Sequence, residues 1–340
     1  MTQKLRRLSQ VFCLILFAFV SIALWFSLAM PGPRLYAKPT GFSAEQLAAS
    51  KRMETHVRRL ATEIGPRHVG VPTSIEATLA YMEADWSSQG FVSKRHRFGT
   101  WDRPFYNLEL AFPGTKLADE WVVIGAHYDT EPQTPGANDN ASGIAVLLEL
   151  ARRLRTRPMA RSVRLVAFAN EEAPWGMTEN MGSVAYARRC RQRGEAIHAM
   201  ISMDSVGYFS DEPGSQRYPR PLGLYYGQKG DYLALVGDWS SAWLVRKSIR
   251  AFRAATVLPS EGSALPRIFR DIARSDHSSF WRFGYSAMLV TDTAPFRDPN
   301  YHRSGDRPQN IDFERLSLVA EGIEAIIFEL ASTESSVDEK

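Results

Sequence analysis

Side chains that bind metals follow three apolar runs of the sequence, each at the point where the run ends. They are His127 and Asp129 after residues 121–126, Glu171 and Glu172 after 163–168, and Asp204 after 197–203. Imidazole and carboxylate groups are ligands that zinc takes from proteins. Carboxylates gathered at one place repel one another unless cations hold them together. The pattern therefore predicts a metal site.

Two further segments supply ligands of the same kind. Asp139 lies in the loop 135–143, directly before a helical segment, and His302 follows the apolar run 285–291. Two histidines and three carboxylates, one of them shared, are what two divalent ions such as zinc require. Structural zinc sites usually use cysteine, and the sequence has only two cysteines. We therefore expect a catalytic site rather than a structural one.

The elements that must position these residues follow from the hydrophobic periodicity. Short apolar runs alternate with helical periodicity, which predicts strands and crossover helices in a largely parallel sheet. The predicted strands are 121–126, 163–168, 197–203 and 285–291, and the predicted helices are 43–61, 144–154, 240–255 and 313–330. Proteins with such sheets bind their ligands at the carboxyl ends of the strands. We expect one α/β domain over residues 43–333, with a mixed, largely parallel sheet flanked by helices, a linker at 31–42 and a polar tail at 334–340.

Six short motifs stand at these positions. They are Gly125–Thr130 (GAHYDT), Gly136–Gly143 (GANDNASG), Asn170–Glu172 (NEE), Ser202–Asp204 (SMD), Ser275–His277 (SDH) and Tyr301–His302 (YH). In content and order they resemble the motifs of the M28-type zinc metallopeptidases, the family of co-catalytic aminopeptidases. The resemblance covers roughly residues 43–333 and implies a zinc exopeptidase fold with two zinc ions per chain.

The resemblance implies a role for each residue. His127 and Asp204 would bind one zinc, Glu172 and His302 the other, and Asp139 would bridge both. Asp129 would accept the second imidazole N–H of His127 and so set its tautomer. Glu171 would be the general base that takes a proton from a water shared by the zincs and passes it to the leaving amine. The family also implies a cis peptide bond between Asp139 and Asn140.

This sequence departs from the family pattern near the metals. The segment 173–181 is inserted after the paired glutamates, and Trp175, Met177 and Met181 within it either line a specificity pocket or pack as a plain loop. Arg303 and Arg307 either meet a substrate carboxylate or face water, which leaves dipeptidase and carboxypeptidase activity open.

Asp276 and His277 are candidates for binding substrate or handling protons. Alternatively, Ser275 and Asp276 cap the helix that contains Phe280.

Three functions are compared. The favoured one is a dizinc aminopeptidase that releases N-terminal residues from peptides. The second is a glutaminyl-peptide cyclase with a single zinc on Asp139, Glu172 and His302, in which Glu171, Asp204 and Asp276 would handle protons. The Asn138-Asp139-Asn140 segment and Asn170 favour the peptidase. The third is a non-catalytic membrane-anchored binding ectodomain, which is disfavoured because inactive relatives typically lose a ligand or the base.

The N-terminal segment resembles a signal anchor. Residues 11–30 contain no charged side chain and are long enough to cross a bilayer, and the flank 1–10 carries Lys4, Arg6 and Arg7. By the positive-inside rule, the catalytic domain lies on the exported, periplasmic or extracellular side. The alternative is a signal peptide, because Ser27 and Ala29 form a small-x-small pair before a cleavage point; the protein would then be secreted.

The charge of the chain argues against a nucleic-acid partner. The 41 Lys and Arg residues and 37 Asp and Glu residues give a net charge of +4. Three of the basic residues and none of the acidic ones lie in residues 1–30, so the remaining chain has 38 basic and 37 acidic residues, a net charge of +1. The basicity therefore belongs to the membrane-proximal flank, and the expected partners are peptides and a membrane.

Overall fold

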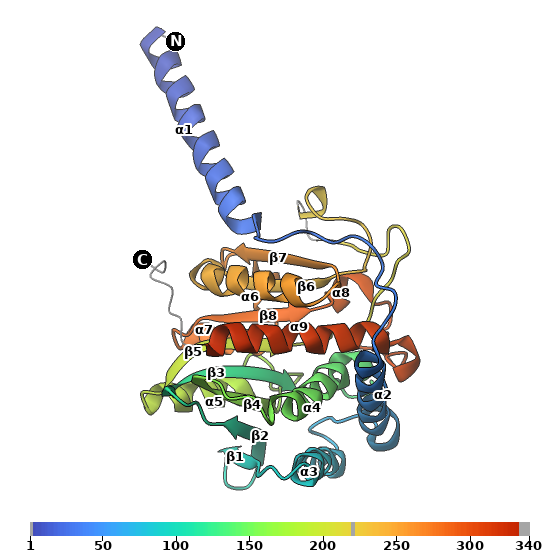
Figure 1. Cartoon of the computed structure of the whole chain (residues 1–340). Coiled ribbons are helices and arrows are strands. Elements are labelled where there is room, and N and C mark those ends of the chain that lie inside the picture. The colour runs from blue at the N-terminus through green and yellow to red at the C-terminus, as the bar shows by residue number, and fades with distance from the viewer. Residues whose placement is uncertain (1–2, 219–221, 333–340) are drawn as a thin grey trace.

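The computed structural model describes residues 3–218 and 222–332, and within them eight strands form one sheet (Figure 1). The strands are β1 Lys94–Gly99, β2 Pro104–Phe112, β3 Leu117–His127, β4 Arg161–Phe168, β5 Ala196–Met203, β6 Leu233–Asp238, β7 Ser260–Leu265 and β8 Ala287–Thr291. Their order is β1-β2-β4-β3-β5-β8-β6-β7. The central strands β4, β3, β5 and β8 are parallel, β6 and β7 are parallel to each other, and β1, β2 and the β6–β8 pair add antiparallel contacts. The sheet is mixed and largely parallel, as predicted.

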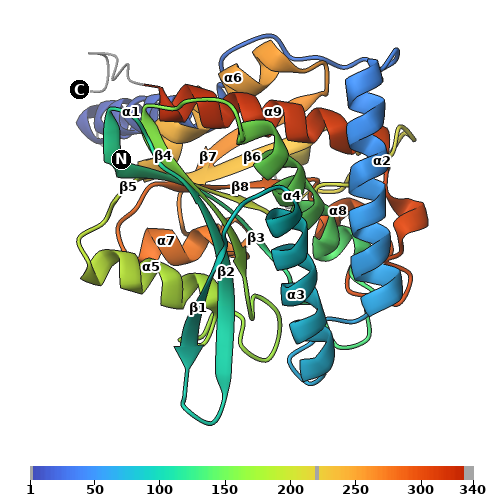
Figure 2. The ribbon, with the colours of Figure 1, turned by 60° about the horizontal axis from the view of Figure 1, so that its bottom comes forward.

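Helices cover both faces of the sheet (Figure 2). The α-helices of the described residues are α1 Gln3–Leu28, α2 Ala44–Arg58, α3 Pro72–Ser88, α4 Gly143–Leu154, α5 Gly182–Gln192, α6 Ala242–Ala255, α7 His277–Arg282, α8 Ala294–Arg297 and α9 Phe313–Ala331, of which α1 projects away from the sheet. One core, with Leu147, Phe252 and Ile323, joins the sheet to α2, α4, α6 and α9. A second core, with Tyr186 and Phe280, joins the other face to α5 and α7.

The four predicted strands are the four central ones. β3, β4, β5 and β8 are buried along most of their length, and strands covered on both faces read as continuous apolar runs. The strands β1, β2, β6 and β7 were not predicted. β1 has the sequence KRHRFG with several exposed side chains at the sheet edge, and β7 contains glycine and serine, so neither has an apolar run that would reveal it.

The predicted helices are present with shifted ends. Ser43 and Gln46 form the predicted capping box of α2, whose backbone continues as a π-helix from Arg59 to Ile64. α6 begins at Ala242 after a short 3-10 turn, and α9 begins after Asp312, which accepts a hydrogen bond from the amide of Arg315.

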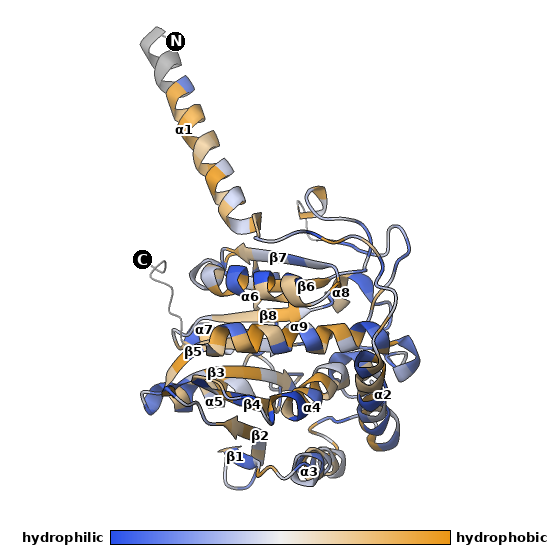
Figure 3. Cartoon of the chain, viewed as in Figure 1, coloured by the Kyte–Doolittle hydropathy of each residue, from blue (hydrophilic) through white to orange (hydrophobic). Residues whose placement is uncertain are grey.

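The apolar N-terminal helix α1 projects from the domain next to β7 (Figure 1). Residues Gln10–Leu28 have a mean hydropathy of 2.6 and are long enough to cross a membrane. Figure 3 shows that this helix is apolar along most of its length. Most of its large apolar side chains are exposed, whereas Ser27 and Leu28 at its end are buried.

Candidate metal centre

The carboxyl ends of the central parallel strands bring the predicted ligands together. His127 is the last residue of β3, Glu172 lies four residues after the end of β4, and Asp204 directly follows β5. β3 lies between β4 and β5, so these three ends are adjacent. Asp139 comes from the short π-helix Ala137–Ser142 before α4, and His302 from the turn after α8.

The first group of ligands surrounds His127. Its Nε2 lies 3.2 Å from Oδ1 of Asp139 and 3.5 Å from Oδ1 of Asp204. Ligand atoms of these three residues all lie within 4.8 Å of one another. This group can hold one divalent ion.

The second group uses the other oxygen of Asp139. Nε2 of His302 lies 3.0 Å from Oδ2 of Asp139 and 3.5 Å from Oε1 of Glu172. Glu131 joins Glu172 and His302 in a further group of ligand atoms within 4.8 Å, and it was not predicted from the sequence. Asp139 therefore lies between two sets of ligands, with one oxygen facing each.

The hydrogen bonds around the cluster fit a metal. Nδ1 of His127 lies 3.2 Å from the backbone carbonyl of Asp129, which can only accept, so Nδ1 carries a proton. Nε2 of His127 and Oε1 of Glu172 are buried and have no hydrogen-bond partner. Imidazole nitrogens and carboxylate oxygens are the donor types that zinc binds, so each of these two unpaired atoms fits a metal ligand.

The electrostatics also fit a cation. Burial and the charges of Asp204 and Asp276 raise the pKa of Glu171 well above its usual range. Burial and the charges of Asp139 and Glu171 do the same to the pKa of Glu172. These carboxyl groups therefore resist ionisation together, and a nearby dication would favour their charged forms.

Asp129 supports the site in a different way from the expected one. Its carboxylate lies 3.7 Å from Nδ1 of His127, and the histidine bonds to the Asp129 carbonyl instead. The two carboxylate oxygens accept hydrogen bonds from the amides of Glu171 and Glu172, at 3.1 Å and 3.0 Å. Asp129 thus orients the segment after β4 rather than the imidazole directly.

Two asparagines connect the Asp139 segment to the end of β5. Nδ2 of Asn140 donates to the carbonyl of Met203 at 2.8 Å, and Oδ1 of Asn138 accepts from the amide of Gly207 at 2.9 Å. The Asp139–Asn140 peptide bond is cis, as the resemblance implied. These bonds hold Asp139 beside Asp204.

Asp306 also holds the segment that contains Asp139, and the sequence analysis did not identify it as a site residue. It is buried and accepts hydrogen bonds from the amides of Asn138 at 2.7 Å and Asp139 at 3.0 Å. Burial raises its pKa to about 7, although those two hydrogen bonds oppose the shift. Its only signal in the sequence was an acid four residues after His302, and loop aspartates are usually turn residues.

Arg67 is a second positioning residue that the sequence did not reveal. Its guanidinium is fully buried and donates to the carbonyls of Tyr128, Pro135 and Gly136, which flank the metal cluster. Burial lowers its pKa to about 10. No motif marks this arginine, because its partners are backbone carbonyls of distant segments.

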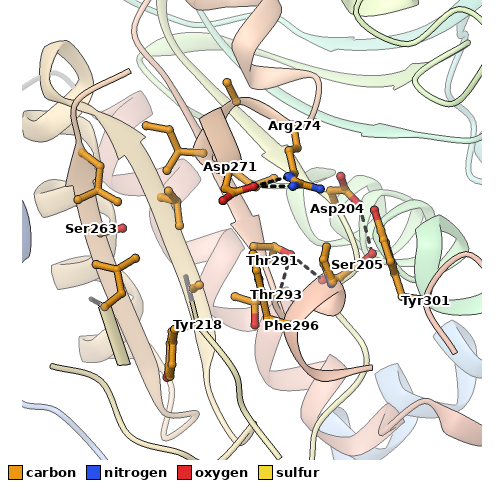
Figure 4. A pocket seen from close by; sticks show the side chains of 18 of the residues that line it. Asp204, Ser205, Tyr218, Ser263, Asp271, Arg274, Thr291, Thr293, Phe296 and Tyr301 are labelled. Atoms are coloured by element: carbon orange, nitrogen blue, oxygen red, sulfur yellow. Dashed lines mark hydrogen bonds and ion pairs between the residues drawn. The ribbon is translucent and has the colours of Figure 1, made fainter. Parts of the chain in front are cut away.

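A cavity of about 500 Å³ opens from the cluster over β8, β6 and β7. Figure 4 shows Asp204 and Tyr301 at one end and Ser263 of β7 at the other, with Tyr218, Thr293 and Phe296 between them. Aliphatic and aromatic side chains make up much of the wall, including Leu222, Tyr226, Val236, Leu265 and Leu289. The cavity is large enough for an amino-acid side chain.

The inserted segment contributes one side chain to this cavity. Met177 lines it, but Trp175 does not, and Trp175 packs on Phe105 and Arg103 instead. Met181 is buried below, beside Ser279. Arg303 and Arg307 are exposed and do not line the cavity, so the solvent-facing interpretation holds for both.

Asp276 and His277 lie behind the site without lining the cavity. Both are fully buried. Nε2 of His277 lies 2.7 Å from the carbonyl of Ile272, burial lowers its pKa to about 4, and its ring packs edge-on against Trp281. Asp276 is the first residue before α7 but makes no side-chain capping bond, and burial raises its pKa to about 7. His277 is therefore structural, whereas Asp276 is an unpaired carboxyl group near Glu171.

The fold and this set of residues define a zinc metallopeptidase. Residues 107–327 match the model of peptidase family M28, and the chain belongs to that family. It is 30% identical to the uncharacterized protein YfbL of Escherichia coli, over 84% of this chain and 90% of that protein. It is also 30% identical to the aminopeptidase YwaD of Bacillus subtilis, over 63% of this chain but only 42% of that protein.

Solved structures share the fold. A zinc aminopeptidase from Bacillus subtilis, BSAP, superposes with a TM-score of 0.67 at 16% identity, covering 84% of this chain and 96% of that one. A glutaminyl cyclase from Fimbriiglobus ruber superposes with a TM-score of 0.62 at 18% identity, covering 88% and 99%. At these identities the likeness is one of fold.

Proposed function

We propose that this protein is a dizinc aminopeptidase. The observation that carries the proposal is the position of Asp139, whose two oxygens face His127 and His302 in separate ligand groups. His127 and Asp204 would hold one ion, Glu172 and His302 the other, and Asp139 both. The aminopeptidase YwaD among the relatives supports the same activity.

Zinc bound here would supply the Lewis acidity that activates water and polarises the substrate carbonyl. Glu171 accepts the proton of the attacking water and returns it to the leaving amine. The carboxylate of Glu171 lines the cavity, and its Oε2 lies 3.9 Å from Nε2 of His127. Asp129 holds the Glu171 backbone in place through the amide hydrogen bond described above.

The cavity supports recognition of an N-terminal residue. Its apolar wall matches an aliphatic or aromatic first side chain, and the metal end would place the backbone of that residue beside Glu171. The test is hydrolysis of a library of unblocked peptides by the full chain, with N-terminally acetylated copies as matched controls. Release of first residues only from free amines supports the aminopeptidase. Cleavage that ignores acetylation contradicts it.

One observation favours a second candidate, a glutaminyl-peptide cyclase with one zinc. Asp276 is an unpaired buried carboxyl group whose pKa burial raises to about 7, which suits proton transfer near neutral pH. Zinc content separates the two candidates: two ions per chain with hydrolysis of free amines support the peptidase. One ion per chain with cyclisation of glutaminyl peptides supports the cyclase.

We also propose that α1 anchors the catalytic domain on the exported side of a membrane. The basic residues Lys4, Arg6 and Arg7 before the apolar segment support this orientation. The chain should remain in membranes after alkaline carbonate extraction, with the domain accessible to protease from the exported side. Recovery of a secreted chain that begins after Ala29 would favour the signal peptide.

A further inference from the structure

The end of α1 is built into the peptidase domain. Nε1 of Trp239 donates to Oγ of Ser27 at 2.9 Å, and the hydroxyl of Tyr225 donates to the carbonyl of Leu28 at 3.2 Å. Arg246 of α6 donates to the carbonyl of Phe26 and lies over its ring. These contacts fix the direction of α1 relative to the domain.

The adjoining segment is held as well. Nη1 of Arg253 donates to the carbonyl of Pro31 at 2.8 Å, and Arg34 pairs with Glu261 of β7 at 3.2 Å. The chain that leaves α1 therefore lies against the domain, and a spanning α1 would bring the α6 side of the domain to the membrane surface.

A cavity of about 670 Å³ lies in the angle between α1 and α6. Its walls are Trp25 and Met30 near the end of α1, three cations and Trp243 of α6, and Glu329 of α9. The cations are Arg246, Lys247 and Arg250. Glu329 is the acidic residue among the described lining residues, 3.9 Å from Nζ of Lys247 and 3.6 Å from Nη2 of Arg250. Three positive charges against one negative charge give the described lining residues a net charge of +2.

Exposed aromatic side chains surround the end of α1, next to the cavity between α1 and α6. Trp25 is 69% exposed and Trp239 is 41% exposed, and Tyr225 is exposed beside the end of α1. Tryptophan and tyrosine prefer the interface between membrane and water, and basic residues beside a spanning helix attract anionic lipids. The apolar part of α1 ends where this aromatic and basic surface begins.

We propose that the cavity between α1 and α6 binds the phosphate of an anionic phospholipid headgroup. The proposal rests on the proposed membrane anchor. The guanidinium group of Arg250 can form paired hydrogen bonds to phosphate oxygens, and Lys247 and Arg246 add two further positive charges. The exposed apolar side chains of α1 that precede Trp25 in the sequence give the acyl chains an apolar surface to pack against. A bound lipid would lock the domain at one angle to the membrane.

Native mass spectrometry of the full chain in detergent tests the proposal. The chain is titrated separately with phosphatidylglycerol and with phosphatidylcholine of the same acyl chains. We expect the wild type to bind phosphatidylglycerol about tenfold more tightly or better, from the contribution of several basic side chains. The Lys247→Gln, Arg250→Gln double variant should lose this preference, and it keeps Arg246 so that α1 stays docked. The matched control is Lys94→Gln with Arg191→Gln, two exposed cations on β1 and α5.

The outcomes separate the alternatives. Equal binding of the two lipids by the wild type, or an equal loss in the control variant, overturns the proposal. Carbonate extraction tests the anchor independently, since none of these variants changes α1.

Discussion

At the scale of single residues, two adjacent glutamates have different environments. Both line the cavity, but Oε1 of Glu172 lies 3.5 Å from Nε2 of His302, whereas Oε2 of Glu171 lies 3.9 Å from Nε2 of His127. Asp129 binds both backbone amides, which holds the two side chains in their separate directions. The structure therefore supports a division between a metal ligand and a base within one dipeptide.

Replacing Glu171 tests that division. Glu171→Gln keeps the size of the side chain but cannot accept a proton, so we expect kcat to fall about 10²-fold or more. Steady-state kinetics and zinc analysis of the same preparation give the result. Near-normal turnover at full zinc content would contradict the role of Glu171.

Asp306 acts one contact away from the metal site. Asp306→Asn offers one amide oxygen where two carboxylate oxygens accept from Asn138 and Asp139, so Asp139 should become less well positioned. We expect zinc affinity to fall about 10- to 100-fold, measured by competition with a chelator. Asp119→Asn, an exposed residue of β3, is the matched control. Unchanged zinc affinity in Asp306→Asn would show that the loop holds Asp139 without it.

At the scale of elements, Glu149 joins α4 to α2. Its buried carboxylate accepts from Nε of Arg52 at 2.9 Å and from Arg152 and Arg153 of its own helix. Burial alone would raise the pKa of Glu149, but the hydrogen bonds from Arg52 and Arg152 lower it to about 2. The helix that follows the Asp139 segment is therefore anchored by an ionised side chain.

This pKa predicts an acid-sensitive contribution to folding. A depressed folded-state pKa stabilises the fold above the unfolded value of 4.5, and the contribution disappears as the pH falls towards 2. Glu149→Gln should lower the free energy of unfolding by about 2 kcal/mol at pH 7, and this deficit should shrink between pH 4.5 and 2. Denaturant titrations of both proteins across that range measure it. A deficit that stays constant with pH would mean that packing, not charge, explains the loss.

At the scale of the whole molecule, the metal site joins segments that are distant in the chain. His127, Asp139, Asp204 and His302 come from separate segments that meet at the carboxyl ends of the central strands. The repulsion among the carboxylates opposes folding unless cations are bound, so metal and fold should stabilise each other.

Removing zinc should therefore lower the melting temperature. Zinc at about 100 times its Kd contributes about 2.7 kcal/mol, which corresponds to a shift of several degrees for a domain of this size. Thermal unfolding of the full chain before and after chelation, and after zinc is restored, measures the effect. Asp139→Asn should show little change on chelation, and an equally large shift in that variant would place the stabilising zinc elsewhere.

The sequence alone was enough to predict the central strands and the His, Asp and Glu side chains that the structure brings together. The reason is that both are local: β3, β4, β5 and β8 each contain an apolar run, His127 is the last residue of β3, and Asp204 directly follows β5. The resemblance then implied the sharing of Asp139, which the two ligand groups are consistent with.

Only the tertiary structure decided which distant segments meet. The target of the Asp129 carboxylate, the buried contacts of Arg67 and Asp306, and the absence of Trp175 from the cavity depend on loops that approach one another in space. The end of α1 is the clearest case. Its sequence predicts only an apolar span, but hydrogen bonds to Ser27 and Leu28 from residues 212 and 197 positions away make its last turn part of the domain. Contacts of this kind have no local period or spacing, so no pattern in the sequence reveals them.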